Sequence, residues 1–290
     1  MPEQSQTLSI ILPAKDEAAA LPQLLSGLSK LHPQAELIVV DDGSSDETAA
    51  IAKTHGARVV RHPYPIGNGA AIKSGARAAT GDILVFMDAD GQHDINDIPI
   101  LLDKLQSGFD MVVGARNSAS QATLGRNAAN RLYNRLASWV VGHRIPDLTS
   151  GFRAVRADYF REFLHLLPNG FSYPTTITMA FFRAGYAVAY VPITASKRIG
   201  KSHISPLRDG VRFLLIIFKV GTLYSPLKIF FPISMGFFVL GLIRYIYTFL
   251  TAHQFTIMSA LMFITAILVF LIGLVSEQIT NLLFMTRQQR

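Results

Sequence analysis

The stretch Ile83-Leu84-Val85-Phe86-Met87-Asp88-Ala89-Asp90-Gly91-Gln92 joins a run of strand-forming residues to a pair of carboxylates. The apolar run predicts a buried strand, and Asp88 and Asp90 follow at the point where that strand ends. Ligands bind at strand ends in open α/β sheets, and two carboxylates there suit a hard divalent cation, which prefers oxygen ligands. A solvated turn is the alternative interpretation of an isolated Asp-x-Asp pair.

Short apolar strands alternate with helices along the first part of the chain. Strands are predicted at 8–13, 37–40, 57–60, 83–87 and 111–113, and helices at 18–31, 46–55, 70–79 and 98–105. Continuously apolar strands between amphipathic helices indicate a mostly parallel sheet that is covered on both faces. We therefore predict a doubly wound α/β domain.

A second acidic segment, Asp41-Asp42-Gly43-Ser44-Ser45-Asp46-Glu47, follows the strand predicted at 37–40. Ser44 and Glu47 fit the S-x-x-E capping box that begins a helix. The box does not account for two adjacent aspartates at the end of a buried strand. These carboxylates can accept hydrogen bonds from the ribose hydroxyls or the base edge of a nucleotide; plain turn chemistry is the alternative.

The segment 67–75, Gly-Asn-Gly-Ala-Ala-Ile-Lys-Ser-Gly, is similar to a phosphate-binding loop. Ile72 stands where a dinucleotide fingerprint has its third glycine, and Gly200-Lys201-Ser202 lacks the earlier glycine of a P-loop, because position 195 is alanine. Two interpretations stay open: direct phosphate contact, or a Gly-Asn turn opening a small-residue helix that packs closely on the sheet. Lys73 is accordingly either a diphosphate ligand or a surface charge.

Two long apolar runs dominate the C-terminal part of the 290-residue chain, whose residues are 50% hydrophobic and only 16% charged. Residues 229–249 contain a single charge, Arg244, and residues 254–285 contain only Glu277. Each run exceeds the roughly 20 residues that span a bilayer. The short link 251–254 predicts a helical hairpin, and the expected depths of Arg244 and Glu277 argue against their pairing.

Charges flanking these runs predict the topology. Lys219 and Lys228 precede the first run, Arg287 and Arg290 follow the second, and the link has no Lys or Arg. By the positive-inside rule, the N-terminal domain and both termini face the cytoplasm, as in a bacterial-type inner membrane. The N-terminal residues do not form a signal peptide, because their apolar run is short and is followed by charges. The absence of cysteine excludes disulfides and thiolate zinc sites.

The predicted domain organisation follows from these patterns: a cytoplasmic α/β domain at 1–205, an amphipathic interfacial helix at 206–226, and transmembrane helices at 227–250 and 255–285. The helix before the spans has the apolar spacing of a helix lying on the bilayer, although packing against the α/β domain explains it equally. The net charge of +7 and the arginines between positions 116 and 161 favour anionic lipid headgroups as partners. Nucleic acid is a poor fit to a chain with a membrane hairpin.

Four motifs occur in order at matching strand ends: Pro13-Ala14-x-x-Glu17, Asp41-Asp42-Gly-Ser-x-Asp46, Gly67-Asn68-Gly69 with Lys73, and Asp88-Ala-Asp90-Gly-Gln92. Together they resemble the inverting family 2 glycosyltransferases of the GT-A fold. Three later segments, beginning at Gly114, Asp147 and Arg198, resemble the polyprenyl-phosphate branch, the relatives of dolichol-phosphate mannose synthase. The resemblance covers about residues 8–205 and extends to the hairpin.

The resemblance implies roles for individual residues. It makes Asp88, Asp90 and Gln92 the metal site for Mg²⁺ or Mn²⁺. The residues implied around the nucleotide-sugar are Pro13, Ala14, Glu17, Asp42, Lys73, Asp88, Ala89 and Ser202. Arg116 and Arg126 are implied to face the lipid phosphate, and Arg198 the diphosphate or the acceptor. Asp90, Arg116 and Arg198 are the implied catalytic residues, while His203 stands where some relatives have lysine.

The implied reaction transfers a sugar from a UDP- or GDP-linked donor to undecaprenyl or dolichyl phosphate. A phosphate monoester has a second pKa of about 6, so its oxygen is already a nucleophile at neutral pH and needs no strong base. A divalent cation and cationic side chains stabilise the leaving diphosphate, and one in-line displacement inverts the anomeric centre. The sugar and the pathway are not identified, and a homo-oligomer such as a tetramer is compatible with the sequence.

Two functions other than sugar transfer to a polyprenyl phosphate are alternatives. A processive polysaccharide synthase has similar nucleotide-sugar motifs but also a Gln-x-x-Arg-Trp sequence, and here the single tryptophan, Trp139, follows Leu-Ala-Ser. A membrane scaffold or lipid-carrier partner with an inactive transferase domain is the alternative from a different class. The intact Asp42, Asp88, Asp90 and Gln92 argue against such decay.

Overall fold

The computed structural model describes residues 6–116, 124–170, 172–193, 215, 218, 221–222 and 225–288, with the side chains of 124–130 and 283–288 left out. The chain divides into two compact units. The first, here called the catalytic unit, comprises Met1–Arg135 and His143–Phe213. The second, the hairpin unit, comprises Leu136–Gly142 and Leu214–Arg290. The interfacial helix predicted at 206–226 lies almost wholly outside the described residues.

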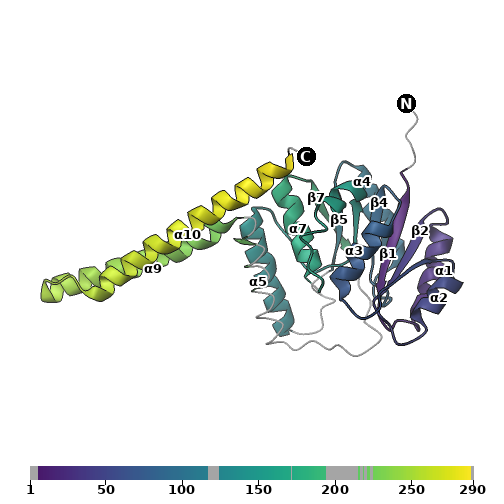
Figure 1. The fold of residues 1–290 in the computed structure, drawn as a ribbon, viewed down its shortest axis with the longest axis horizontal. Coiled ribbons are helices and arrows are strands. Elements are labelled where there is room, and N and C mark those ends of the chain that lie inside the picture. Colours follow the sequence, from purple (N-terminus) through teal and green to yellow (C-terminus); the bar gives the residue numbers. More distant parts are fainter. Residues whose placement is uncertain are drawn as a thin grey trace. The chain divides into compact units, whose positions relative to one another are not determined.

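A seven-stranded sheet forms the centre of the catalytic unit, in the order β3-β2-β1-β4-β6-β5-β7 (Figure 1). Its strands are β1 Leu8–Ala14, β2 Glu36–Asp41, β3 Arg58–Arg61, β4 Ile83–Phe86, β5 Met111–Arg116, β6 Arg153–Arg156 and β7 Val188–Ile193. Strands β1 to β4 pair in parallel, as do β5 and β7, while β6 is antiparallel to β4 and β5. The prediction of a mostly parallel α/β sheet is confirmed.

The helices of the catalytic unit connect these strands. They are α1 Leu21–Leu31, α2 Thr48–Thr54, α3 Asn68–Ala78, the 3₁₀ turn η1 Ile95–Asp97, α4 Ile98–Gln106, α5 Leu124–Val141, α6 Ala157–Glu162 and α7 Tyr173–Ala184. Helix α5 continues into the hairpin unit. The capping box expected at Ser44 and Glu47 is wrong: α2 begins at Thr48, and the Ser44 hydroxyl instead accepts a hydrogen bond from the Asp16 amide at 3.0 Å.

Helices cover both faces of the sheet because alternate residues of its central strands point to opposite sides. Ile10 and Leu12 of β1 are fully buried in a core that includes Leu25 of α1 and Leu101 of α4. Ile11 faces the other side, where α3 packs so closely that a Cβ on Gly75 would lie 2.3 Å from the Ile11 Cγ2 atom. The sheet is therefore doubly wound.

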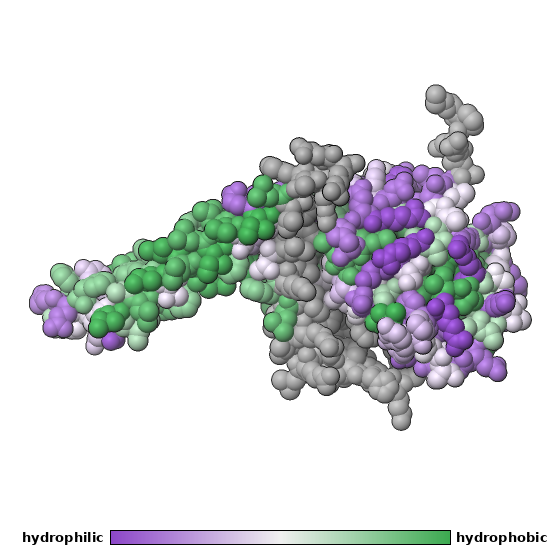
Figure 2. Space-filling model, in the orientation of Figure 1, coloured by the Kyte–Doolittle hydropathy of each residue, from purple (hydrophilic) through white to green (hydrophobic). Residues whose placement is uncertain are grey.

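The hairpin unit contains two long apolar helices, α9 Pro226–Ala252 and α10 Ile257–Gln288. Both are long and apolar enough to cross a membrane, and Figure 2 shows that hydrophobic side chains dominate their visible surface. The helices approach closely at small residues: a Cβ on Gly273 would lie 2.6 Å from the Phe230 Cβ atom. The Ser234 hydroxyl donates to the carbonyl of Ala266 at 2.8 Å.

Two charged side chains satisfy helix ends near the start of α9. The Leu227 amide, in the first turn, donates to the Glu277 carboxylate of α10 at 3.2 Å. The Lys228 ammonium donates to the Val140 carbonyl at 3.0 Å, in the last turn of α5. The first four amides and last four carbonyls of a helix lack partners within it, so both contacts supply missing ones. Within the hairpin unit, Glu277 therefore faces the start of α9.

Candidate active site

The carboxyl ends of β1, β2 and β4 lie at one edge of the sheet, because these strands are parallel. Ala14 at the end of β1 is paired in register with Asp41 at the end of β2, and Ile11 with Phe86 of β4. The Met87 amide extends the pairing by donating to the Ile11 carbonyl at 3.2 Å. Asp88 follows directly, so the two acidic segments recognised in the sequence share this edge.

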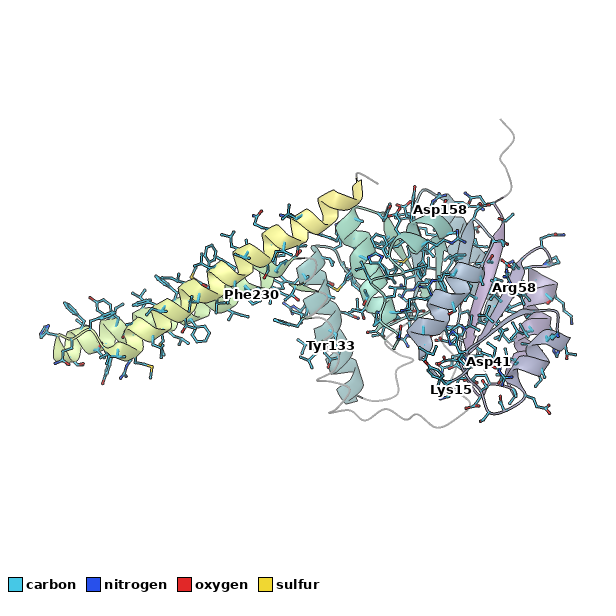
Figure 3. The ribbon with its side chains drawn as sticks, in the orientation of Figure 1. Lys15, Asp41, Arg58, Tyr133, Asp158 and Phe230 are labelled. Atoms are coloured by element: carbon cyan, nitrogen blue, oxygen red, sulfur yellow. The ribbon has the colours of Figure 1, made fainter. Side chains whose placement is uncertain are left out.

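The segments that follow β1 and β2 are joined by hydrogen bonds that involve side chains. The amides of Asp16, Glu17 and Ala18 donate to the Ser44 hydroxyl at 3.0 Å, the Thr48 hydroxyl at 3.0 Å and the Asp46 carboxylate at 3.2 Å. In return the Ser45 amide donates to the Asp16 carboxylate at 2.8 Å. Figure 3 places Lys15 and Asp41 at the same end of this unit. These bonds hold the two segments together; Glu17 belongs to the first of them, and Pro13 and Ala14 directly precede it.

Asp42 is bound on both carboxylate oxygens. Its Oδ1 accepts from the Ile66 amide at 2.8 Å and contacts the His62 Nδ1 at 2.7 Å, and its Oδ2 accepts from the Gly67 amide at 2.8 Å. The His62 Nε2 in turn meets the Ser74 hydroxyl at 2.8 Å. Burial opposes ionisation, but the hydrogen bonds from His62 and the amides lower the pKa of Asp42. Asp42 thus anchors the loop between β3 and α3.

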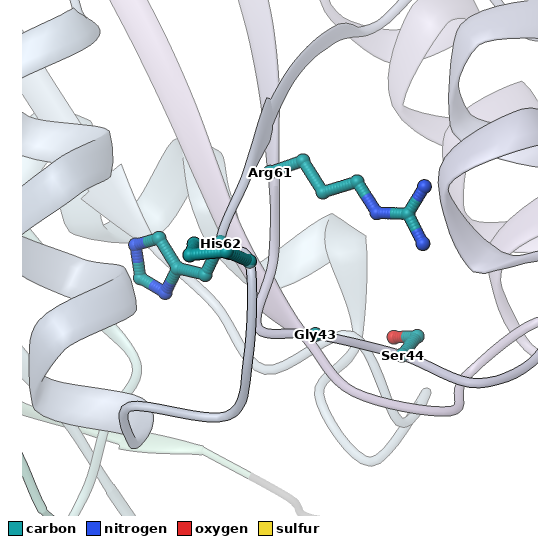
Figure 4. Close-up of a pocket in the computed structure, with 5 residues that line it drawn as sticks. Gly43, Ser44, Arg61 and His62 are labelled. Atoms are coloured by element: carbon teal, nitrogen blue, oxygen red, sulfur yellow. The ribbon is translucent and has the colours of Figure 1, made fainter.

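A hollow of about 340 Å³ lies beside this network, lined by Gly43, Ser44, Arg61, His62 and Pro63. Figure 4 shows Arg61 and Ser44 on one side of the β3 end, and the His62 ring directed to the other. The Arg61 Nε lies 3.1 Å from the buried Asp41 carboxylate. The hollow is at the β2–β3 end of the edge, next to the acidic segment Asp41-Asp42.

The start of α3 is covered by protein backbone. The Ala70 amide donates to the Asn169 carbonyl at 3.0 Å, and a Cβ on Gly69 would lie 2.1 Å from the Pro168 carbonyl. The Lys73 ammonium donates to the Leu167 carbonyl at 3.1 Å and to the Asn169 side chain at 2.6 Å. Of the two interpretations left open by the sequence, the structure therefore favours close packing of a small-residue helix.

Asp88, Ala89, Asp90 and Gln92 form a tight turn after β4. The Gln92 amide donates to the Asp90 carboxylate at 3.1 Å, and Gly91 makes the turn with a φ of 71°. Ala89 is buried, whereas Asp88, Asp90 and Gln92 are half-buried. Within the described residues no cluster of three His, Cys, Asp or Glu side chains is placed to hold a metal ion. A site here accordingly depends on two carboxylates and the Gln92 amide oxygen.

Arg116, at the end of β5, is held by Asp147. The Arg116 Nε and terminal nitrogen donate to the two carboxylate oxygens at 2.8 and 3.1 Å, and the Thr149 amide donates to the same carboxylate at 3.0 Å. Burial opposes it, but the bonds and charge of Asp147 and the charge of Asp88 raise the pKa of Arg116. Arg116 therefore shares an electrostatic neighbourhood with Asp88.

The sequence did not identify Asp147 as the partner of Arg116, although it belongs to a segment quoted for the family resemblance. Nor did it reveal His62, since nothing in its spacing distinguishes it from a core histidine. Three implied site residues cannot be compared with the fold: Arg198, Ser202 and the side chain of Arg126 lie outside the described residues, as does His203.

Fold and site together define a glycosyltransferase domain of the GT-A type: a doubly wound sheet with carboxylates at its ligand-binding edge. Comparison with known families agrees, because residues 9–164 match glycosyl transferase family 2. Residues 225–282 match the GtrB C-terminal hairpin. The chain therefore belongs to glycosyl transferase family 2.

Characterised relatives and solved structures resemble this chain over most of its length. A dolichyl-phosphate hexose transferase of Haloferax volcanii is 30% identical over 215 residues, which cover 73% of this chain and 93% of the relative. An undecaprenyl-phosphate mannosyltransferase of Micrococcus luteus is 30% identical over 210 residues, covering 67% and 86%. Glucosyl-3-phosphoglycerate synthase from Mycobacterium tuberculosis, solved with Mn²⁺, UDP and phosphoglyceric acid, superposes with a TM-score of 0.61 and 25% identity, covering 75% and 79%.

Proposed function

We propose that the protein transfers a sugar from a nucleotide-sugar to a polyprenyl phosphate in a membrane. The relatives from Haloferax and Micrococcus are both named for a polyprenyl-phosphate acceptor. The match of residues 225–282 to a hairpin family and the apolar character of α9 and α10 support a membrane-bound acceptor. The flanking charges support a cytoplasmic position for the catalytic unit and both termini.

The observation that carries the proposal is the meeting of opposite charges at one edge of the sheet. Asp88 is half-buried after β4, and Arg116 is at the end of β5 on the same edge, where Asp147 and, to a smaller extent, Asp88 raise the pKa of Arg116. A carboxylate is a suitable ligand for a divalent cation, and the cation in turn binds the diphosphate of the donor. A guanidinium is a suitable partner for the phosphate monoester of the acceptor, to which it can donate hydrogen bonds. Residues suited to the nucleotide-sugar donor and to the lipid-phosphate acceptor thus lie at the same edge of the sheet.

Asp88, Asp90 and Gln92 are the residues that would hold Mg²⁺ or Mn²⁺. The fit rests on their chemistry, since all three offer oxygen ligands from one turn, and Gly91 allows the chain to close on itself there. When bound, the cation supplies charge that stabilises the leaving diphosphate. The glucosyl-3-phosphoglycerate synthase that superposes on this chain was solved with Mn²⁺ and UDP, which supports the same donor chemistry.

On the acceptor side, Asp147 holds the Nε and one terminal nitrogen of Arg116. The other terminal nitrogen of Arg116 is proposed to donate to the lipid phosphate. Arg126 is proposed as a second lipid-phosphate residue, and Arg198 and Ser202 as contacts to the diphosphate. Pro13, Ala14, Glu17, Asp42, Lys73 and Ala89 are proposed to surround the nucleotide. Asp42 and Lys73 do so in part by fixing the loops around α3, as their bonds to Gly67 and Asn169 indicate.

The proposed reaction is a single displacement, in which an oxygen of the lipid phosphate attacks the anomeric carbon while the bond to the diphosphate breaks. The phosphate is ionised at neutral pH, so no side chain needs to remove a proton. Asp42 and Asp147 are poor candidates for a base in any case, because hydrogen bonds to each carboxylate lower their pKa values. Attack from the face opposite the leaving group inverts the anomeric configuration.

The test offers the purified full chain undecaprenyl phosphate, Mg²⁺ or Mn²⁺ and a panel of UDP- and GDP-sugars, with glycolipid detected by mass spectrometry. Asp90→Ala is the loss variant. Asp158→Ala is the matched control, because Asp158 lies at the start of α6 with its carboxylate 92% exposed. We expect product with one donor from the wild-type protein and the control, and none from Asp90→Ala. Equal product from Asp90→Ala would refute the assigned site.

A further inference from the structure

His93, the residue after the proposed metal ligand Gln92, is buried beneath the same turn. Its side chain is only 5% exposed, and its Nε2 lies 3.6 Å from the Asp88 Oδ2. The ring stacks on Phe152, with centroids 4.9 Å apart and planes inclined by 25°. Hydrogen bonds of this type are about 2.7–3.2 Å long, so a movement of about half an ångström would bring the imidazole into one with Asp88.

Gly151, the residue before Phe152, lies next to Asp88. A Cβ on Gly151 would lie 3.4 Å from the Asp88 Oδ2, in van der Waals contact with the carboxylate. The Gly151 carbonyl accepts from the Tyr173 hydroxyl at 3.2 Å, and the Phe152 carbonyl accepts from the Gly114 amide of β5 at 3.0 Å. The wall behind Asp88 is therefore fixed by backbone bonds.

The buried side chain of Arg153 holds the segment that lies behind Asp88. Its side chain is fully buried, its terminal nitrogen donates to the Ser150 carbonyl, and the other donates to the Thr178 hydroxyl at 3.3 Å. The guanidinium also lies over the Tyr173 ring, 5.6 Å from its centroid. These contacts tie the segment from Ser150 to Arg153 to helix α7 through Thr178 and Tyr173.

We propose that His93 is a positioning residue for Asp88: stacked on Phe152, it directs its Nε2 at the carboxylate and holds it for a divalent cation. The inference rests on the proposed metal-dependent function and adds a residue to it. Metal-binding side chains are commonly oriented by a second group that is itself anchored, and removal of that group typically weakens metal binding. Here the anchor is an aromatic stack instead of a second hydrogen bond.

Packing alone does not account for an imidazole at this position. Within the described part of the chain, the buried Nδ1 of His93 has no hydrogen-bond partner. A phenyl ring would stack on Phe152 equally well without burying that polar atom, which costs about 1–3 kcal/mol when left unsatisfied. The other ring nitrogen, Nε2, faces the Asp88 carboxylate, which is a contact that a phenyl ring could not make.

The test measures Mn²⁺ affinity of the full chain by electron paramagnetic resonance, independently of turnover. His93→Phe keeps the stacked ring and removes Nε2, and His93→Gln restores an N–H donor of similar reach. We expect His93→Phe to weaken Mn²⁺ binding about 10- to 100-fold, as for other residues that orient metal ligands, and His93→Gln to recover most of it. His143→Phe is the matched control, since His143 stacks on Phe182 at 5.0 Å, and should bind as the wild type does.

Unchanged affinity in His93→Phe, or equal losses in His93→Phe and His93→Gln, would overturn the inference while leaving the metal site intact. A wild-type protein that binds no Mn²⁺, or one whose binding survives Asp88→Asn, would overturn the metal site itself. If His93→Phe does not fold, His93→Met replaces it in the comparison with His93→Gln, because methionine fills the space without an N–H donor.

Discussion

Replacing Asp147 with asparagine should destabilise the catalytic unit, because it removes the charge that holds Arg116. The Asp147 side chain is 6% exposed and that of Arg116 28% exposed. Breaking a buried ion pair by removing one partner costs about 3–5 kcal/mol. Arg116 is partly exposed, and asparagine keeps a carbonyl oxygen that can still accept a hydrogen bond. We therefore expect the free energy of unfolding to fall by about 2–3 kcal/mol, which is less than the full cost for a buried pair.

The assay is thermal unfolding of the full chain in detergent, followed by circular dichroism. For a unit of this size a loss of 1 kcal/mol lowers Tm by about 2–4 °C, so the Asp147→Asn transition should move down by about 5–10 °C. Asp158→Asn is the control: Asp158 pairs with Arg161 at 3.4 Å, but its side chain is 92% exposed. Such surface pairs contribute little, and this variant should melt within about 1 °C of the wild type.

Two results would refute the reasoning. One is an Asp147→Asn protein that melts with the wild type, which would mean that the pair contributes no net stability. The other is an equal loss in Asp158→Asn, which would mean that any change of a carboxylate has this effect. A double variant, Arg116→Met with Asp147→Leu, should recover part of the loss, because neither charge is then left buried alone. The double variant should form no glycolipid if Arg116 binds the acceptor phosphate.

The remaining predictions concern pH and close packing. The pKa values of Asp42 and Asp147 are below the ordinary 3.8, so their ionised forms stabilise the fold. That stabilisation is complete above the pKa of about 4 that these groups have in the unfolded chain, and it is lost as the pH falls through their lower pKa values in the folded protein. The Tm of the catalytic unit should therefore drop when it is measured below about pH 4. The drop should be less steep in Asp147→Asn, which lacks one of the two carboxylates. Gly69→Ala should lower Tm, because its Cβ would meet the Pro168 carbonyl at 2.1 Å, whereas Gly170→Ala, with open space around it, should not. Gly273→Val should separate α9 from α10, measured as faster proteolysis of the hairpin in detergent; Gly236→Val, also in open space, should be cleaved as the wild type is.

The sequence was sufficient for the parallel half of the sheet because the relevant signals are local. Strand β3, at the margin of the sheet, is short and only partly buried. Strands β1, β2 and β4 are apolar runs followed by polar residues, and burial on both faces gives such runs their composition. The prediction therefore located the strand that precedes Asp88 within a residue of its observed end. Strand β6 was not predicted, because its four residues, Arg153–Arg156, include two arginines and gain their place through pairing with distant strands.

Partners that are distant in the chain limited the prediction of the site. Asp42 stands at a strand end, as expected, but the amides and imidazole that bind it come from Ile66, Gly67 and His62. Lys73 looked like either a phosphate ligand or a free surface charge, and its observed partner Asn169 lies 96 residues away. A one-dimensional pattern indicates which side chains are polar at an edge, but not which of them are already bound by the fold.

Strand β6 lies between β4 and β5, although it follows both in the chain. During synthesis, β1 to β4 can pair as soon as they are made, and Asp88 and Asp90 are then at the end of an exposed strand. The segment that supports Asp88 and the carboxylate that holds Arg116 both immediately precede β6, so they reach the edge only when β6 inserts. Forming such long-range pairs is the slow part of folding. The last strand to enter the middle of the sheet therefore completes both halves of the site at once, so a partly folded chain has neither.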